Sequence, residues 1–207
     1  MIAVLTGDLV HSSKMSQPDF NRSVQAVETF IADCTDKYGA QGYGYRGDAF
    51  QLMFPEPQPA LNAALQFKLA LGAGVGLETP ADCTLSLAYG EGTVSESGPR
   101  SALGEAYVCS GRNLDRAARG SIHVAICGGS GDEEMGLLCE FLSHLLGRLT
   151  TSQKQLLHSY LESGFAEHRV LAQQLHTSRQ NISQRLAAIG AELVRDFVYL
   201  VNTRVGG

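Results

Sequence analysis

The segment from residue 2 to residue 10, IAVLTGDLV, constrains the fold of this chain more than any other stretch. It is a nearly continuous apolar run, and such a run predicts a central strand that is buried on both faces. Asp8 interrupts the run. A carboxylate in such a strand is unfavourable unless it is paired, hydrogen-bonded or bound to a metal. The segment therefore predicts both a covered sheet and a candidate site at Asp8.

Strand and helix patterns alternate from this strand to about residue 147. The expected strands are residues 2–10, 41–46, 49–54, 83–90 and 121–127, and the expected helices follow the loop around Pro18 and cover 59–75, 104–120 and 132–147. Pro59 suits the first turn of its helix, and Gly120 is the expected stop of the next one. The order β-α-β-β-α-β-α-β-α predicts an α/β (α+β) fold with a ferredoxin-like βαββαβ core.

The last sixty residues differ from the rest of the chain. Residues 148–207 have no clear strand pattern and are expected to form a separate all-helical domain, which leaves 1–147 as the α/β domain. The chain has a net charge of −5, yet residues 150–207 contain six basic and four acidic side chains. A mildly basic tail on an acidic body weakly indicates a polyanionic partner. No apolar run approaches the roughly 20 residues of a membrane span, so a cytoplasmic protein is expected.

Asp8 and Asp48 form the candidate metal site. Each follows a glycine, and Asp48 lies in the turn between the second and third expected strands. In a βαββ unit the first strand is central, so its end can lie beside that turn. Mg²⁺ or Mn²⁺ takes one or two carboxylates and completes its shell with waters and phosphates. The alternative is that Asp48 only forms the turn and Asp8 only caps the next loop.

Four motifs, in this order, resemble the catalytic domain of class III nucleotidyl cyclases. They are VLTGDLV, YRGDAFQLMF, LAYGEGTV and LGEAYVCSGRNLDRA. The chain over nearly its full length is more similar to the SatD family, which joins a cyclase-like domain to a C-terminal helix-turn-helix. The resemblance implies a cyclase-like fold, a homodimer, and binding of a nucleotide or related phosphate ligand.

The resemblance also implies roles for single residues. The metal carboxylates of cyclases fall on Asp8 and Asp48, and an arginine that steadies the triphosphate falls on Arg112. Val108 stands where cyclases carry an asparagine of the transition-state machinery, and Gly44 stands where they carry the lysine that recognises the base. Ligand binding is therefore expected to survive better than cyclisation, and an active cyclase or nucleotidyltransferase is the alternative.

Three more side chains are candidate phosphate contacts. Arg46 lies two residues before Asp48, and His11 and Lys14 lie in the loop after the first strand. Loops at strand ends commonly carry ligand-binding groups. The alternative for each of them, and for Arg112, is an ordinary solvated surface side chain.

Residues 170–189, VLAQQLHTSRQNISQRLAAI, have the pattern of a helix-turn-helix. The first helix has its inner face at Leu171, Ala172 and Leu175, and the second at Ile182, Leu186 and Ile189. Between them His176 stands where a glycine with positive φ is common, and Ser178 or Thr177 can cap the second helix.

The outer face of the second helix carries the expected DNA contacts. They are Ser178, Arg179, Gln180, Ser183 and Gln184. Such side chains reach base edges or phosphates in the major groove. A helical bundle with a solvated polar face is the alternative.

The apolar C-terminal segment 191–205 either packs back on the helix-turn-helix or forms a dimerisation helix. Together these patterns predict a DNA-binding regulator that responds to a metal and a phosphate ligand. A structural protein with vestigial sites is a further alternative.

Overall fold

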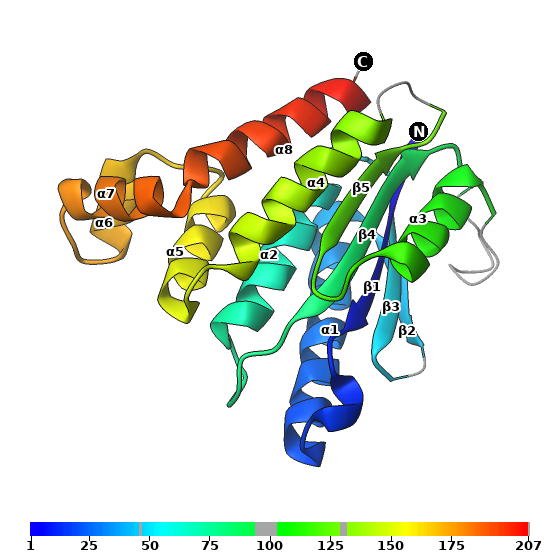
Figure 1. Ribbon diagram of the computed structural model, residues 1–207, viewed down its shortest axis with the longest axis horizontal. Helices are drawn as coiled ribbons and strands as arrows, with labels where there is room; N and C mark the ends of the chain where they lie inside the picture. The colour runs from blue at the N-terminus through cyan, green and yellow to red at the C-terminus, as the bar shows by residue number, and fades with distance from the viewer. Residues whose placement is uncertain (46, 94–102, 129–131, 207) are drawn as a thin grey trace.

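The structure, a computed structural model, describes residues 1–45, 47–93, 103–128 and 132–206. In these residues five strands form one sheet in the order β2-β3-β1-β4-β5 (Figure 1). The strands are β1 (Ile2–Leu9), β2 (Gln41–Tyr45), β3 (Ala49–Phe54), β4 (Cys83–Gly90) and β5 (Ile122–Ile126). The central strand β1 is antiparallel to β3 and β4, and β5 runs parallel to β4. The first four strands with their helices form the predicted βαββαβ core.

Successive side chains of β1 point to opposite faces of the sheet, as the period of a strand requires. Ala3, Leu5 and Leu9 belong to the large hydrophobic core, whereas Ile2 and Val4 pack in a second cluster. Asp8 shares the face of Ile2 and Val4. It is the one residue of β1 that is only half-buried. The strand is thus covered on both faces, as predicted, except at Asp8.

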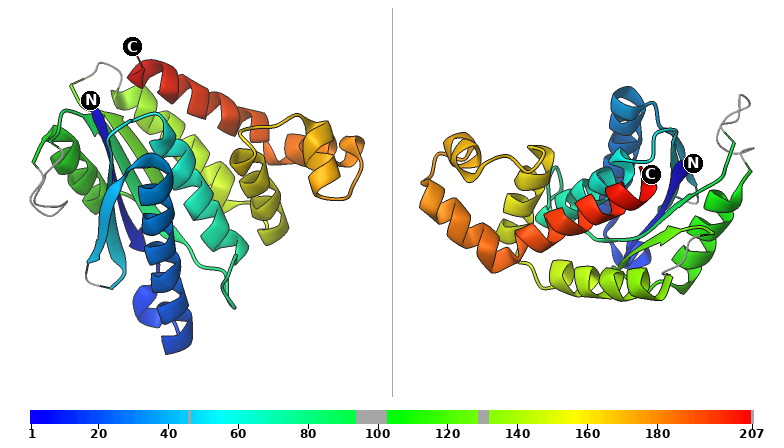
Figure 2. Two further views of the ribbon diagram at one scale, coloured as in Figure 1. Left: turned by 180° about the vertical axis from the view of Figure 1, so that it is seen from behind. Right: turned by 90° about the horizontal axis from the view of Figure 1, so that it is seen from above.

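Helices α1 (Gln17–Tyr38) and α2 (Pro59–Ala73) cover one face of the sheet, and α3 (Glu105–Arg116) packs on the other (Figure 2). On the first face, α4 (Asp132–Gly147) lies along β5. Pro59 opens α2 as predicted. The expected end of α3 at Gly120 is wrong, because the backbone becomes extended at Ala117 and the helix ends at Arg116.

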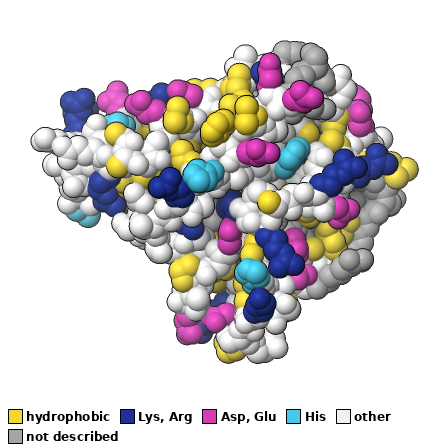
Figure 3. Space-filling model, in the orientation of Figure 1, with side chains coloured by type: hydrophobic (Ala, Val, Ile, Leu, Met, Phe, Trp, Pro, Cys, Tyr) yellow, Lys and Arg dark blue, Asp and Glu magenta, His cyan; other side chains and the backbone are white. Residues whose placement is uncertain are grey.

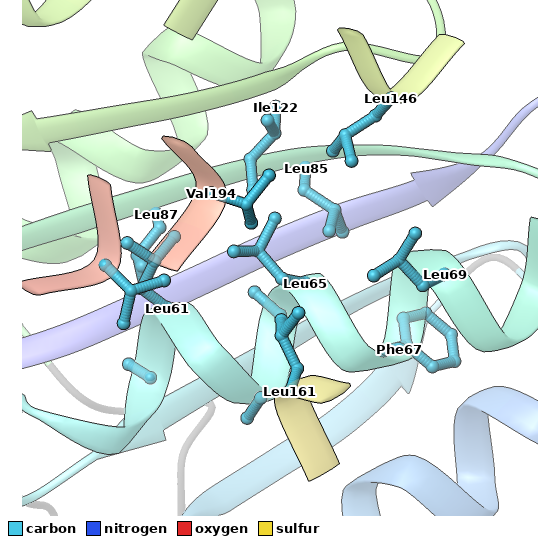
Figure 4. Close-up of a cluster of buried hydrophobic side chains, with 14 of the residues drawn as sticks. Leu61, Leu65, Phe67, Leu69, Leu85, Leu87, Ile122, Leu146, Leu161 and Val194 are labelled. Carbon is cyan, nitrogen blue, oxygen red and sulfur yellow. The ribbon is translucent and has the colours of Figure 1, made fainter. Parts of the chain in front are cut away.

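Four helices follow: α5 (Thr151–Glu162), α6 (His168–Gln174), α7 (Arg179–Ile189) and α8 (Ala191–Val205). Their buried side chains belong to the same hydrophobic core as the sheet. Figure 4 shows Leu161 of α5 and Val194 of α8 packed around α2 together with Leu85 and Leu87 of β4. Buried side chains on both sides of residue 147 thus belong to one hydrophobic core, and the domain boundary at this residue stays a prediction.

Most of the surface of α2 is buried, and a row of residues along one side, Asn62, Gln66, Ala70 and Ala73, is partly exposed. Its Phe67 ring stacks on Phe30 of α1 with centroids 4.3 Å apart, and its Lys68 is 6% exposed and paired with Asp82.

No helix in the described part of the chain is long and apolar enough to cross a membrane.

Candidate functional site

The structure brings Asp8 and Asp48 together at the end of β1. Asp8 lies opposite Ala49 in the register of β1 and β3, and the backbone N–H of Leu9 donates to the carbonyl of Asp48 at 3.0 Å. Burial raises the pKa of the Asp8 carboxyl, the negative charge of Asp48 raises it further, and Arg119 lowers it. The two carboxylates thus repel each other at a half-buried position.

Their hydrogen bonds differ. The Ser12 hydroxyl donates to Asp48 Oδ2 at 2.6 Å, which fixes the orientation of that carboxylate. Among the described residues, no group hydrogen-bonds the Asp8 carboxylate. A half-buried carboxylate without a donor, beside a second carboxylate, favours binding of a cation.

Gly7 and Gly47, the glycines before the two aspartates, are required for different structural reasons. A Cβ atom on Gly7 would lie 2.3 Å from Phe50 Cζ and 2.8 Å from Leu85 Cδ2, so only glycine lets these buried side chains close over β1. Gly47 has φ of +86° in the β2–β3 turn. Asp48 is therefore a turn residue and also a neighbour of Asp8.

The donor set fits a hard divalent cation. No cluster of three or more His, Cys, Asp or Glu side chains that could hold a metal ion occurs in the described ranges. A site of two carboxylates is nevertheless what Mg²⁺ uses when waters and a phosphate complete its shell. Asp8 and Asp48 are thus the residues that could hold Mg²⁺ or Mn²⁺.

Two of the predicted phosphate contacts lie in the turn after β1, close in sequence to Asp8. His11 and Lys14 are exposed on the turn that follows β1, and Ser12 of the same turn is bonded to Asp48. Arg46 lies outside the described residues. In Figure 3, acidic, basic and histidine side chains gather on the surface at this end of the sheet.

Arg112 is exposed on α3 and is not brought to the carboxylates within this chain. Ser110 of the same helix faces the sheet, because its hydroxyl lies 2.6 Å from Thr6 Oγ1 and donates to the carbonyl of Ser86. At 3.6 residues per turn, Arg112 is rotated by about 200° from Ser110. It therefore points away from the sheet.

The sequence reasoning missed two residues of the site. Ser12 gave no signal beyond its place in the loop after β1. Arg119 falls within the expected helix over residues 104–120, whereas in the structure it lies in the turn after α3 and its charge acts on Asp8. Its one local signal was Gly120, a turn-forming glycine directly after it.

A separate cavity lies away from the two carboxylates. A groove of about 850 Å³ runs between α1, α2 and α5 on the opposite face of the sheet. Its lining includes Phe30, Phe67 and His158 and neither carboxylate.

Helices α6 and α7 meet at a tight turn, where His176 has φ of +51°. Ser178 caps α7 by accepting a hydrogen bond from the N–H of Asn181 at 3.1 Å. The inner face of α7 is buried as predicted, at Ile182, Leu186 and Ile189. The exposed face carries the predicted DNA contacts Ser178, Arg179, Gln180, Ser183 and Gln184.

The first of these two helices differs from expectation at one residue. Leu171 and Ala172 are buried, but Leu175 is 40% exposed and does not belong to the inner face. The helix ends at Gln174, so Leu175 already lies in the turn and its side chain leaves the helical stripe.

Comparisons with known proteins give structural neighbours only. No family model and no curated protein matches the chain. Similar solved structures include an adenylate/guanylate cyclase/hydrolase from Silicibacter pomeroyi, with 20% identity and a TM-score of 0.48, over 59% of this chain and 73% of that one. A guanylate cyclase domain from Catenaria anguillulae in complex with GTP has 15% identity and a TM-score of 0.46, over 65% and 80% of the two chains.

A dimeric guanylyl cyclase domain from Blastocladiella emersonii has 16% identity and a TM-score of 0.45, over 59% of this chain and 78% of that one. These structural neighbours are thus nucleotidyl cyclase domains. With identities and TM-scores this low, the activities of these proteins do not carry over to this chain.

Proposed function

We propose that this protein binds a divalent cation through Asp8 and Asp48 and, with it, a nucleotide or related phosphate ligand. The observation that carries the proposal is the pair itself: two carboxylates converge at the end of a buried strand, and Asp8 has no hydrogen-bond donor among the described residues. Ser12 holds Asp48 in place. Such a pair suits Mg²⁺ or Mn²⁺.

A bound Mg²⁺ or Mn²⁺ would neutralise the two carboxylates and polarise a phosphate oxygen. In this chain Asp8 and Asp48 would hold the cation. His11, Lys14 and Arg46 remain the predicted contacts to the ligand's phosphates. Arg112 also remains a predicted phosphate contact, although within one chain it points away from the sheet.

Calorimetry of Mg²⁺ and of each Mg²⁺–nucleoside triphosphate tests this proposal. Wild type should bind, and Asp48→Asn should weaken cation binding strongly, whereas Asp36→Asn should not, because Asp36 is an exposed acid on α1. A cation at 100 times its Kd should stabilise the fold by about 2.7 kcal/mol. A melting curve unchanged by both cation and nucleotide would instead favour a structural protein with vestigial sites.

We infer a second function, DNA binding, from α6 and α7. The observation that favours it is a capped α7 with Arg179, Gln180, Ser183 and Gln184 on its exposed face, after a tight turn. These are side chains that read base edges in the major groove. A homodimer would place two such helices on paired half-sites.

DNA binding is tested by titration of DNA at several salt concentrations. Affinity should fall steeply with salt, and Arg179→Ala or Gln180→Ala should reduce sequence preference. Arg148→Ala is the matched control, because Arg148 is exposed but lies in the α4–α5 connection. No binding at low salt would end this part of the proposal.

Both parts combine into a ligand-responsive DNA-binding regulator, in which the ligand would alter dimer geometry. An active cyclase is the weaker alternative. Gly44 has no side chain to read a base, and Val108, 50% exposed on α3, has no polar group to offer a transition state. Incubation with Mn²⁺ and each of the four nucleoside triphosphates should give no cyclic or oligomeric product.

A further inference from the structure

We propose that Arg119 is the residue that contacts the ligand's phosphate, in the place that the sequence resemblance gives to Arg112. This inference rests on the proposed function, because it concerns the ligand held beside Asp8 and Asp48.

The turn places Arg119 on the β4 side of Asp8. The N–H of Ser121 donates to the carbonyl of Ala118 at 3.0 Å, and Gly120 between them has φ of +75°. The N–H of Gly120 donates to Thr84 Oγ1 at 3.0 Å. Thr84 is the direct β4 partner of Asp8 in the sheet register. Arg119 thus directly precedes Gly120, which is hydrogen-bonded to Thr84, and Thr84 lies beside Asp8 in the sheet.

Asp82 fixes the same turn to the core. Its Oδ1 accepts hydrogen bonds from Lys68 Nζ at 2.6 Å and from the N–H of Cys83 at 2.8 Å. Its Oδ2 fills the space beside Gly120, where a Cβ atom would lie 2.7 Å away. Its carbonyl accepts from the N–H of Val10 at 2.8 Å. Asp82 thus contacts the Arg119 turn and the start of β4 with its side chain and the exit of β1 with its backbone carbonyl.

The Arg119 guanidinium itself is free to bind a ligand. It is exposed, and it forms no hydrogen bond or ion pair with any residue in the described ranges. A guanidinium presents a planar fork of donors that matches the oxygens of a phosphate. Arg112 has the same chemistry but points away from the sheet.

The two sides of Asp8 are therefore different. Asp48 lies on the β3 side, and Arg119 lies on the β4 side. A cation held by the carboxylates and the guanidinium of Arg119 would present two positive groups across the end of β1. That arrangement selects a ligand with at least two linked phosphates, one on the cation and one on Arg119.

Calorimetry with two probes tests this assignment: Mg²⁺ alone, and inorganic tripolyphosphate in saturating Mg²⁺. Arg119→Gln should bind Mg²⁺ alone more tightly than wild type, because a positive charge near the carboxylates is removed. It should bind tripolyphosphate about tenfold to a hundredfold more weakly, because charge-assisted hydrogen bonds are lost. Arg119→Lys should restore part of the affinity.

Arg116→Gln is the matched control, since it removes one exposed arginine from α3. Opposite changes in the two affinities for Arg119→Gln, absent from Arg116→Gln, support the inference. Equal effects of both variants, or parallel losses of both affinities, overturn it. Wild type that binds Mg²⁺ but not tripolyphosphate also overturns it, whereas wild type that binds no Mg²⁺ overturns the proposed metal site.

Discussion

Leu161→Ala should destabilise the sheet and the C-terminal helices together. Leu161 lies on α5, is 0% exposed, and packs against α2 in the core shared with β4 (Figure 4). Leucine-to-alanine changes at such sites cost about 2–5 kcal/mol. For a chain of this size each kcal/mol lowers Tm by about 2–4 °C, so the expected fall is about 4–20 °C.

Two probes should report the same transition. Circular dichroism follows the helices, and the reaction of Cys83 with a thiol reagent follows the sheet, because Cys83 is fully buried in β4. Both midpoints should shift equally in Leu161→Ala. Leu193→Ala is the control, since Leu193 lies on α8 and is 68% exposed, and it should change stability by less than about 0.5 kcal/mol.

Separate midpoints would refute this reasoning. If the helices melted while Cys83 stayed protected, residues 148–207 would be a unit with stability of their own. The predicted boundary at residue 147 would then be a true domain boundary.

Three further predictions concern the site. The pKa of Asp8 in the cation-free folded state is raised above its ordinary value of 3.8. Between these two pKa values the folded state binds more protons than the unfolded state, so the free energy of unfolding should fall as pH rises. Above the folded pKa it should level off. Urea unfolding should show this loss in wild type and not in Asp8→Asn. Gly7→Ala should cost about 1–3 kcal/mol in the same assay, because its Cβ would meet Phe50 Cζ at 2.3 Å. Ser12→Ala should weaken Mg²⁺ binding about tenfold by calorimetry, since Asp48 loses its 2.6 Å hydrogen bond, and unchanged binding would contradict the role of Ser12.

Local patterns in the sequence were sufficient for most of the fold. The apolar run at 2–10 and the proline at 59 act over a few residues, so they predict β1 and the start of α2 directly. The neighbourhood of Asp8 and Asp48 followed from topology, because a βαββ unit places its hairpin beside its first strand.

The remaining features depend on turns and on contacts distant in sequence. Arg119 reaches the site through a turn held by Thr84, and Ser12 reaches it by a side-chain hydrogen bond across 36 positions. An apolar stripe indicates that a helix face is covered but not by which partner, so α5 and α8 could not be assigned to α2. Leu175 was misplaced for a related reason: its helix ended one residue earlier than the stripe suggested.

The burial of most of the surface of α2 has a consequence for how the protein is made. The helix ends at Ala73, but α5 begins at Thr151 and α8 ends at Val205. At translation rates of about 5–20 residues per second, about 7–26 s pass between the synthesis of the end of α2 and that of the end of α8, the last helix that covers it. During that interval an apolar face is open to solvent and to chaperones. The core around α2 is completed only after α8 has been synthesised.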